Sequence, residues 1–220
     1  MNTTNQLDFD HVYEPGQSEW TLLLLHGTGG DEHDLVPLGR QLAPDAALLS
    51  PRGKVLEAGM PRFFRRLAVG QLDIPDLRER TDELAAFVTA AAQAYGRDPN
   101  RIVAVGFSNG ANIAVSLLLR HPHLLRGAVL LRPMLPYEPE GDLQLTGTHV
   151  LVAAGEGDPY SSPEQTQRLA EVLGNAGAGV TVHVEPRAGH NLGQGDLRAL
   201  ASFVADLTAA NSAPAAADRR

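Results

Sequence analysis

Six short apolar runs, most of them continuous rather than alternating, constrain the fold of this chain more than any other feature. A strand with one face in water alternates apolar and polar residues, whereas a strand buried on both faces of a parallel sheet is apolar throughout. The runs therefore predict the strands of a largely parallel sheet. They are Thr21–Gly27, Ala46–Pro51, Arg101–Phe107, Gly127–Leu131, His149–Gly155 and Val180–Pro186.

The segments between these runs repeat apolar residues every three or four positions, which is typical of helices with one buried face. Pro75 and Pro163 stand where two of these helices would begin, and Ser162 is a suitable N-cap. Strands that alternate with helices and connect by right-handed crossovers form a doubly wound sheet. We therefore predict an α/β fold, with a mostly parallel sheet and helices on both faces. The segment FDHVYEPG, residues 9–16, could add an antiparallel edge strand.

Length and composition predict one domain. The chain has 220 residues, 43% of them hydrophobic, and shows no shift in composition along its length. We expect a single domain over residues 1–208, closed by a helix from about Gln194 to Thr208. The Ala- and Pro-rich residues 209–220 are expected to form a disordered tail.

Charge and hydropathy disfavour several classes of partner. The net charge is −8 and the arginines are scattered, which disfavours nucleic-acid binding. No apolar run approaches the roughly 18 residues that span a bilayer, and the start lacks the pattern of a secretory leader. We expect a cytoplasmic protein with no stable membrane association. The sequence leaves open whether the protein forms a homodimer.

The stretch VGFSNGANIA places Ser108 between Gly106 and Gly110, after an apolar strand and before a helical pattern. A residue on such a sharp strand-to-helix turn has a strained backbone, and side chains two positions away on either side would collide with the turn. The turn raises the serine hydroxyl to the carboxyl edge of the sheet, at the positive end of a helix. The pattern predicts a nucleophilic serine.

A serine hydroxyl needs a base to take its proton, and the base needs a carboxylate to hold its tautomer. Both partners should follow later strands, in the order serine, acid, histidine. HVLVAAGEGDP offers Glu156 and Asp158, and VTVHVEPRAGH offers His190. We choose Asp158, because Gly-Asp-Pro runs on into a helix, and keep Glu156 as the alternative acid. His183, inside a predicted strand, is the alternative base.

The oxyanion of an acyl-transfer intermediate needs backbone donors. The N–H of Asn109, directly after the serine, would be one, and the N–H of Thr28 in the glycine-rich loop HGTGG would be the other. The same loop has two rival interpretations, a phosphate cradle and a metal site. The phosphate motif is incomplete, and acidic residues at a helix start are common without a metal. We expect no cofactor and no metal, and interpret His26 as a structural side chain.

Four segments taken in order, LLLLHGTGGDEHDL, VGFSNGANIA, GEGDPYSS and AGHNLG, resemble the small bacterial carboxylesterases of the phospholipase/carboxylesterase family. The resemblance covers about residues 21–204. It implies the α/β-hydrolase fold without a large cap domain and a cofactor-free serine esterase acting on small to medium esters. Ser108, Asp158 and His190 match the family's triad, and Thr28 and Asn109 its oxyanion hole.

One position departs from the resemblance. The thioesterase relatives usually have Gln after the nucleophile, where this chain has Asn109, and this favours a small-molecule ester over a lipid-modified protein. Thioesterase or lysophospholipase activity remains the alternative, and a non-catalytic binding protein is a third. Two groups of residues could form the walls of the substrate pocket, with an arginine available to hold a carboxylate. They are Phe63 and Phe64 with Arg62, Arg65 and Arg66 on one side, and Leu135 and Tyr137 on the other. For the first group, an ordinary surface loop with its aromatic side chains tucked under it is the alternative.

Overall fold

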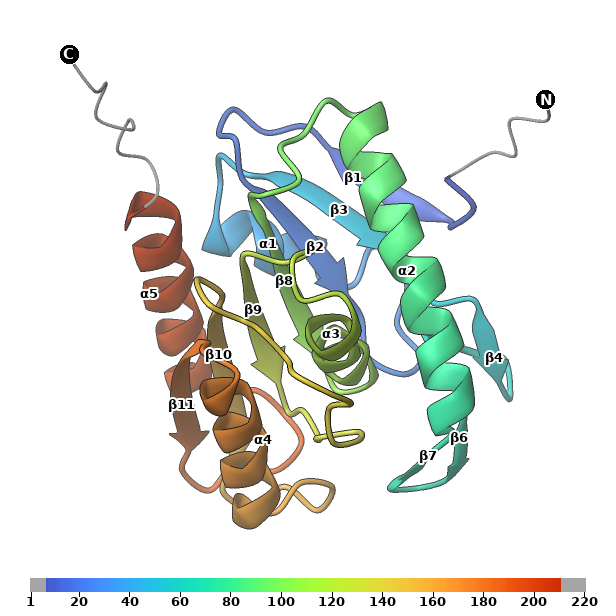
Figure 1. The fold of residues 1–220 in the computed structure, drawn as a ribbon, viewed down its shortest axis with the longest axis vertical. Helices are drawn as coiled ribbons and strands as arrows, with labels where there is room; N and C mark the ends of the chain where they lie inside the picture. The colour runs from blue at the N-terminus through green and yellow to red at the C-terminus, as the bar shows by residue number, and fades with distance from the viewer. Residues whose placement is uncertain (1–6, 211–220) are drawn as a thin grey trace.

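A computed structural model describes residues 7–210 of the chain. Its centre is a seven-stranded sheet in the order β1-β3-β2-β8-β9-β10-β11, in which only β1 runs antiparallel (Figure 1). The strands are β1 His11–Glu14, β2 Thr21–Leu25, β3 Ala47–Pro51, β8 Ile102–Phe107, β9 Gly127–Leu131, β10 His149–Gly155 and β11 Gly179–Glu185.

The six strands expected from the apolar runs all lie in this sheet, within two residues at either end. The expected edge strand is also confirmed, because β1 pairs antiparallel with β3. The final helix reaches Ala210, two residues into the segment expected to be a tail. Residues 211–220 of that expected tail lie outside the described residues, and the single domain over residues 1–208 stays a prediction.

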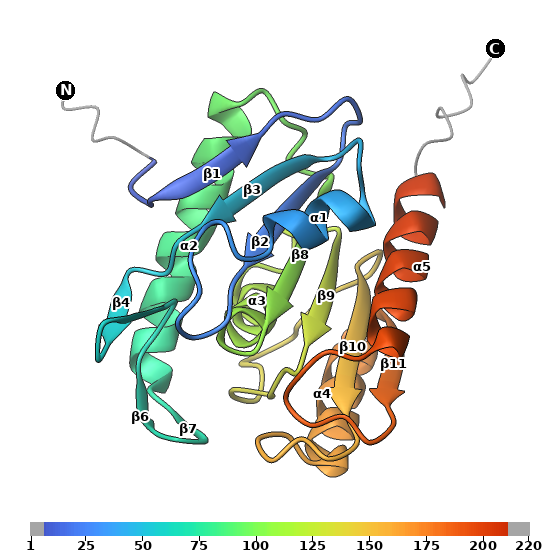
Figure 2. The same cartoon turned by 180° about the vertical axis from the view of Figure 1, so that it is seen from behind.

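Within residues 7–210, five helices cover both faces of the sheet, as predicted (Figures 1 and 2). Helices α2, α3 and α4 cover one face, and α1 and α5 cover the other. Their bounds are α1 Val36–Leu42, α2 Ile74–Ala94, α3 Asn109–Arg120, α4 Pro163–Asn175 and α5 Gln194–Ala210. Ser162 caps α4 and forms a capping box with Gln165, as its position before Pro163 suggested.

The continuous apolar runs arise because successive side chains of one strand enter different cores. In β2, Leu23 and Leu25 pack in the core under α2, α3 and α4, whereas Leu22 and Leu24 pack in the core under α1 and α5. All four are fully buried. A polar residue at any of these positions would leave an unsatisfied group in one core or the other.

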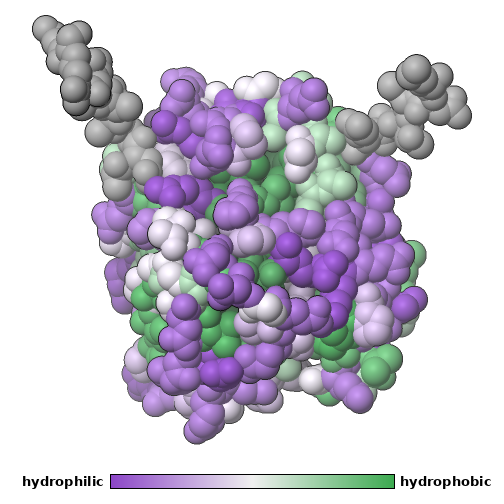
Figure 3. Space-filling model, viewed as in Figure 1, coloured by the Kyte–Doolittle hydropathy of each residue, from purple (hydrophilic) through white to green (hydrophobic). Residues whose placement is uncertain are grey.

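Two small hairpins between β3 and α2 were not expected from the sequence. Strands β4 (Val55–Glu57) and β5 (Met60–Arg62) form one, and β6 (Arg66–Ala68) and β7 (Gln71–Leu72) form the other. Apolar side chains are exposed on both, with Leu56 69% and Leu67 66% exposed. In Figure 3, residues coloured as hydrophobic reach the surface at the lower right, where Figure 1 places the β6–β7 hairpin.

Between β9 and β10, residues 132–148 form only loops and turns, so no cap domain is inserted there. None of the described helices combines the length and the apolar character needed to cross a membrane.

Candidate active site

Ser108 occupies a sharp turn between β8 and α3, with φ 52° and ψ −111°. This backbone conformation is strained for a residue with a side chain, at a cost of about 1–3 kcal/mol, and such strain clusters at functional sites. The flanking glycines have a steric cause. A Cβ on Gly106 would lie 2.5 Å from the Gly110 carbonyl oxygen, and one on Gly110 would lie 2.0 Å from that of Leu25. The second contact is with the end of β2, so the turn is pressed against the neighbouring strand.

Ser108, His190 and Asp158 form one chain of hydrogen bonds at the carboxyl edge of the sheet. The Ser108 Oγ lies 2.8 Å from His190 Nε2, and His190 Nδ1 lies 2.8 Å from Asp158 Oδ2. With a proton on Nδ1, His190 donates to the carboxylate and its Nε2 accepts from the serine hydroxyl. The side chain of Asp158 is 1% exposed, whereas that of His190 is 26% exposed. The base can therefore be reached from solvent while its acid is held inside.

The structure places Asp158, and not Glu156, against His190. Asp158 is fixed by its second oxygen, which accepts the N–H of Tyr160 at 2.9 Å. Glu156 instead accepts the N–H of Arg187 at 2.7 Å, on the surface. His183, the alternative base, lies on β11 and contacts Glu185. It is not part of the Ser108 chain.

The two expected oxyanion donors flank the serine. Asn109 is the first residue of α3, and Thr28 lies in the loop that follows β2. Both line the same cavity as Ser108 and His190. In the described part of the chain, neither backbone N–H has a hydrogen-bond acceptor. Both N–H groups are therefore available to a ligand at the serine.

The side chain of Asn109 holds the segment between the two hairpins against the serine turn. Its Oδ1 accepts the N–H of Phe63 at 2.7 Å. The neighbouring Arg62 donates from Nη1 to Thr28 Oγ1 at 2.6 Å. The sequence did not reveal this role for residues 62–63, because the contacts span 34 and 46 positions of the chain.

His26 is a structural side chain, as expected. Its Nδ1 lies 2.7 Å from the Gly27 carbonyl oxygen, and its Nε2 accepts the N–H of Gly53 at 2.9 Å. The proton is therefore on Nδ1, and the ring joins the Thr28 loop to the segment after β3. Burial lowers the pKa of His26 below its ordinary value of 6.5, although the Gly27 carbonyl opposes the shift. The ring is neutral in this arrangement.

A cavity of about 230 Å³ opens beside Ser108, and of the seven residues considered for its walls only Arg62 and Arg66 line it. Phe63 and Phe64 are 2% and 0% exposed and lie in the core. Arg65 points outward, with a 61% exposed side chain paired to Asp73 and Asp76. Leu135 packs on the core, and Tyr137 shares a 2.7 Å hydrogen bond with Ser116 Oγ.

Phe63, Phe64, Arg65, Leu135 and Tyr137 were therefore wrong as pocket residues. Burying a phenylalanine side chain contributes about 1.5–3 kcal/mol, which turns Phe63 and Phe64 into the core, as the alternative interpretation of this segment expected. Arg62 and Arg66, on either side of them, line the cavity. The lining residues are Thr28, Arg62, Arg66, Gly70, Leu72, Phe107, Ser108, Asn109, Asn112, Arg132, Met134, Tyr160 and His190.

Arg132, directly after β9, holds the loop that carries His190. Its Nε donates to the Gly189 carbonyl at 3.0 Å, and its Nη2 donates to the Asn191 carbonyl at 2.6 Å. Its Nη1 also donates to the Ala153 carbonyl at 3.0 Å. The guanidinium makes two further hydrogen bonds with Asp196, and both side chains are 0% exposed. Arg132 was not expected from the sequence, although its place directly after a central strand is a usable signal.

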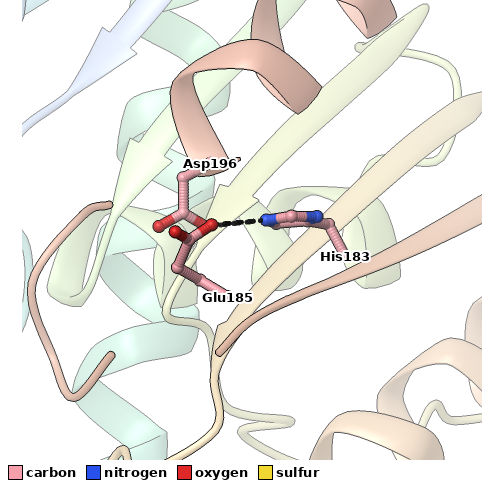
Figure 4. Close-up of side chains that lie close together, drawn as sticks. All are labelled: His183, Glu185 and Asp196. Atoms are coloured by element: carbon pink, nitrogen blue, oxygen red, sulfur yellow. Dashed lines mark hydrogen bonds and ion pairs between the residues drawn. The ribbon is translucent and has the colours of Figure 1, made fainter. Parts of the chain in front are cut away.

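Asp196 is also part of a cluster with His183 and Glu185 (Figure 4). Atoms of the three side chains lie within 4.8 Å of one another, close enough to hold a metal ion. Both oxygens of Asp196 already accept from Arg132, however, and Glu185 accepts the His183 ring and the N–H of Gly195. A cation there would lie beside a buried guanidinium. The cluster is better explained as the anchor of the first turn of α5.

The chain is similar to known proteins over most of its length. The family model described as Phospholipase/Carboxylesterase matches residues 10–208. MhqD of Bacillus subtilis strain 168, which is named as a hydrolase, is 47% identical over 184 residues, covering 84% of this chain and 92% of that protein. Acyl-protein thioesterase 1 of Mycosarcoma maydis is 27% identical over 214 residues, covering 84% of this chain and 89% of that protein.

Solved structures are similar over nearly the whole chain. A carboxylesterase of Bacillus cereus has a TM-score of 0.88 and 45% identity, and the match covers 93% of this chain and 100% of the other. YahD, solved with malic acid, has a TM-score of 0.85 and 30% identity, and the match covers 90% and 99% of the two chains.

Proposed function

The chain belongs to the phospholipase/carboxylesterase family, whose members are hydrolases with the α/β-hydrolase fold, and from this premise we propose that it is a serine carboxylesterase for small esters. One observation carries the proposal. Ser108 Oγ, His190 and Asp158 are joined by two hydrogen bonds of 2.8 Å, and the serine is held in a strained turn.

The proposed reaction begins when His190 Nε2 takes the proton of Ser108 and the serine oxygen attacks the ester carbonyl. Asp158 keeps the proton of the neutral ring on Nδ1 and stabilises the imidazolium that forms. The N–H groups of Thr28 and Asn109 would hold the oxyanion. His190 then protonates the leaving alcohol, and a water activated by the same ring releases the acid from Ser108.

The size of the cavity supports small substrates. Sites for drug-sized ligands have volumes of about 300–1,000 Å³, and the cavity beside Ser108 has about 230 Å³. A short acyl group and a modest alcohol would fill the space.

The test is hydrolysis of 4-nitrophenyl acetate and butyrate by the purified protein, compared with the Ser108→Ala variant. We expect release of 4-nitrophenol by the wild-type protein and loss of nearly all of it in the variant. The control variant Ser162→Ala changes a serine that caps α4 on the surface, and it should retain activity. Turnover that survives in Ser108→Ala would contradict the proposal.

Thioester hydrolysis is the second candidate, supported by the likeness to a fungal acyl-protein thioesterase. The same serine chemistry cleaves both bonds. Parallel assays of butyryl thiocholine and butyryl choline distinguish the two, since the substrates differ only in the atom of the leaving group. Each kcat/KM is divided by the rate constant for uncatalysed hydrolysis of the same substrate. We expect the resulting value for the oxygen ester to be at least equal to that for the thioester.

A further inference from the structure

The charged side chains that line the cavity beside Ser108 are all positive. Three arginines line it, namely Arg62, Arg66 and Arg132, and no acidic side chain is among its lining residues in the described part of the chain. A cavity with cations and no facing carboxylate attracts anions, and its low-dielectric walls strengthen the field.

Arg132 does not supply this attraction. Its five donor positions are all used, two by Asp196 and three by the carbonyls of residues 153, 189 and 191. Its charge is also neutralised by the buried Asp196 carboxylate. The positive charge open to a ligand must therefore come from Arg62 and Arg66.

Arg62 and Arg66 share a single carboxylate. Arg66 donates from Nε and Nη2 to Glu57 Oε1 at 3.0 and 2.7 Å, and Arg62 Nε lies 3.3 Å from Glu57 Oε2. Two cations against one anion leave a net charge of +1. Within the described residues, Arg62 Nη2 and Arg66 Nη1 have no acceptor. Burial lowers the pKa of Arg62, so an added anion would stabilise its charged form.

The side chain of Asn109, a residue that lines the cavity, also has an unused donor, which is buried. Asn109 lines the cavity and is 2% exposed, and its Nδ2 has no hydrogen-bond partner. The amide orientation is fixed, because Oδ1 accepts the N–H of Phe63. A buried donor without an acceptor is destabilising, and a ligand oxygen that reached this nitrogen would supply the missing acceptor.

From these groups we propose that the cavity is an anion subsite, and that the preferred substrates are esters that also carry a free carboxylate. This inference rests on the proposed esterase function and narrows its substrate class. The free carboxylate would be held between Arg62 Nη2 and Arg66 Nη1, with the ester carbonyl at Ser108. Water cleaves the acyl C–O bond and yields an alcohol and a second carboxylate.

The experiment compares matched charged and neutral esters at low ionic strength. For a carboxylate on the acyl part, 4-nitrophenyl hydrogen glutarate is compared with 4-nitrophenyl methyl glutarate. For a carboxylate on the alcohol part, 4-butyryloxybenzoate is compared with its methyl ester. We expect the charged member of at least one pair to have a kcat/KM higher by about tenfold or more, as charge-assisted hydrogen bonds imply. The preference should fall in 0.5 M NaCl.

Arg66→Gln tests the source of this preference. It removes a cation from the cavity and should lower the ratio of charged to neutral kcat/KM by about tenfold. Arg65→Gln is the matched control, because Arg65 is the adjacent arginine, is exposed and does not line the cavity. It should leave the ratio unchanged. Glu57→Gln removes the carboxylate that competes with the substrate for Arg62 and Arg66, and it should raise the ratio of charged to neutral kcat/KM.

Equal kcat/KM values within both pairs for the wild-type protein would overturn the inference. So would a preference that Arg66→Gln and Arg65→Gln change equally. If Arg66→Gln does not fold, inhibition of the wild-type protein by glutarate is compared with inhibition by the neutral glutaramide, and equal inhibition refutes the subsite. Failure of the esterase proposal looks different, because then neither the charged nor the neutral esters are hydrolysed.

Discussion

Replacing Arg132 by Met should destabilise the protein and disorganise the His190 loop at once. The guanidinium makes five hydrogen bonds, two to Asp196 and three to backbone carbonyls, and two of those carbonyls flank His190 on either side. Methionine has a similar length but no donor. The substitution would leave the Asp196 carboxylate buried without its cation.

The size of the effect follows from the burial. Both side chains are 0% exposed, and removing one partner of such a pair costs about 3–5 kcal/mol. For a protein of this size, each kcal/mol lowers Tm by about 2–4 °C, so a fall of about 6–20 °C is expected. Activity should fall further, because displacement of a catalytic group by about 1 Å can cost about 100-fold in rate.

Two further variants separate the two effects, with urea unfolding and ester hydrolysis measured for each. Arg132→Lys keeps the charge but offers at most three donors, so its stability and activity should lie between those of wild type and Arg132→Met. The double variant Arg132→Met with Asp196→Asn buries no lone charge. It should recover much of the stability but little of the activity, since the carbonyls beside His190 still lack their donor.

If Arg132→Met had the same urea midpoint of unfolding as the wild-type protein, the buried pair of Arg132 and Asp196 would not contribute the expected stability. A double variant that recovers full kcat/KM would refute the positioning of His190 by Arg132.

Three other perturbations have definite expected outcomes. Asp158→Asn should lower kcat by about 10⁴-fold, which is the loss known for this change in a serine protease triad. The circular dichroism spectrum should not change. A loss in kcat below tenfold would argue against the contact of Asp158 with His190. Gly110→Ala should lower the free energy of unfolding in urea by more than about 3 kcal/mol, because the new Cβ would collide with a backbone carbonyl. At Gly174 in α4, a new Cβ would meet no other atom, so Gly174→Ala should raise the free energy of unfolding by about 0.5–1 kcal/mol. Burial holds the pKa of His26 below 6.5, so the unfolded state binds the proton more readily. The contribution of His26 to the free energy of unfolding should therefore be constant above pH 6.5 and should decline as the pH falls below 6.5. A His26→Asn variant whose free energy of unfolding declines as much between pH 6.5 and 5 would contradict the assignment of this decline to His26.

The strands and the serine turn could be predicted because their causes are local. A strand buried on both faces must be apolar at every position, as Leu22 to Leu25 are, and a strand-to-helix turn around Ser108 needs glycines two residues away. Asp158 and His190 could be placed because the carboxyl ends of parallel strands meet at one edge of the sheet.

The sequence could not decide which side chains of residues 62–66 form the cavity wall, because this depends on which side of a short irregular segment enters the core. Phe63 and Arg62 are neighbours, yet one side chain is in the core and the other lines the cavity. Two hairpins of two or three residues per strand produce this arrangement, and their pairing has no periodic signal of its own. The contact of Asn109 with Phe63 likewise joins residues 46 positions apart.

The most direct test of the account is to locate the residue that a fluorophosphonate modifies. Such a probe reacts with a serine whose hydroxyl is activated by a neighbouring base, and the modified peptide can be identified by mass spectrometry. We expect one added group per chain, on Ser108, and greatly slowed labelling in the His190→Gln variant. Labelling at another residue, or at an unchanged rate without His190, would contradict it.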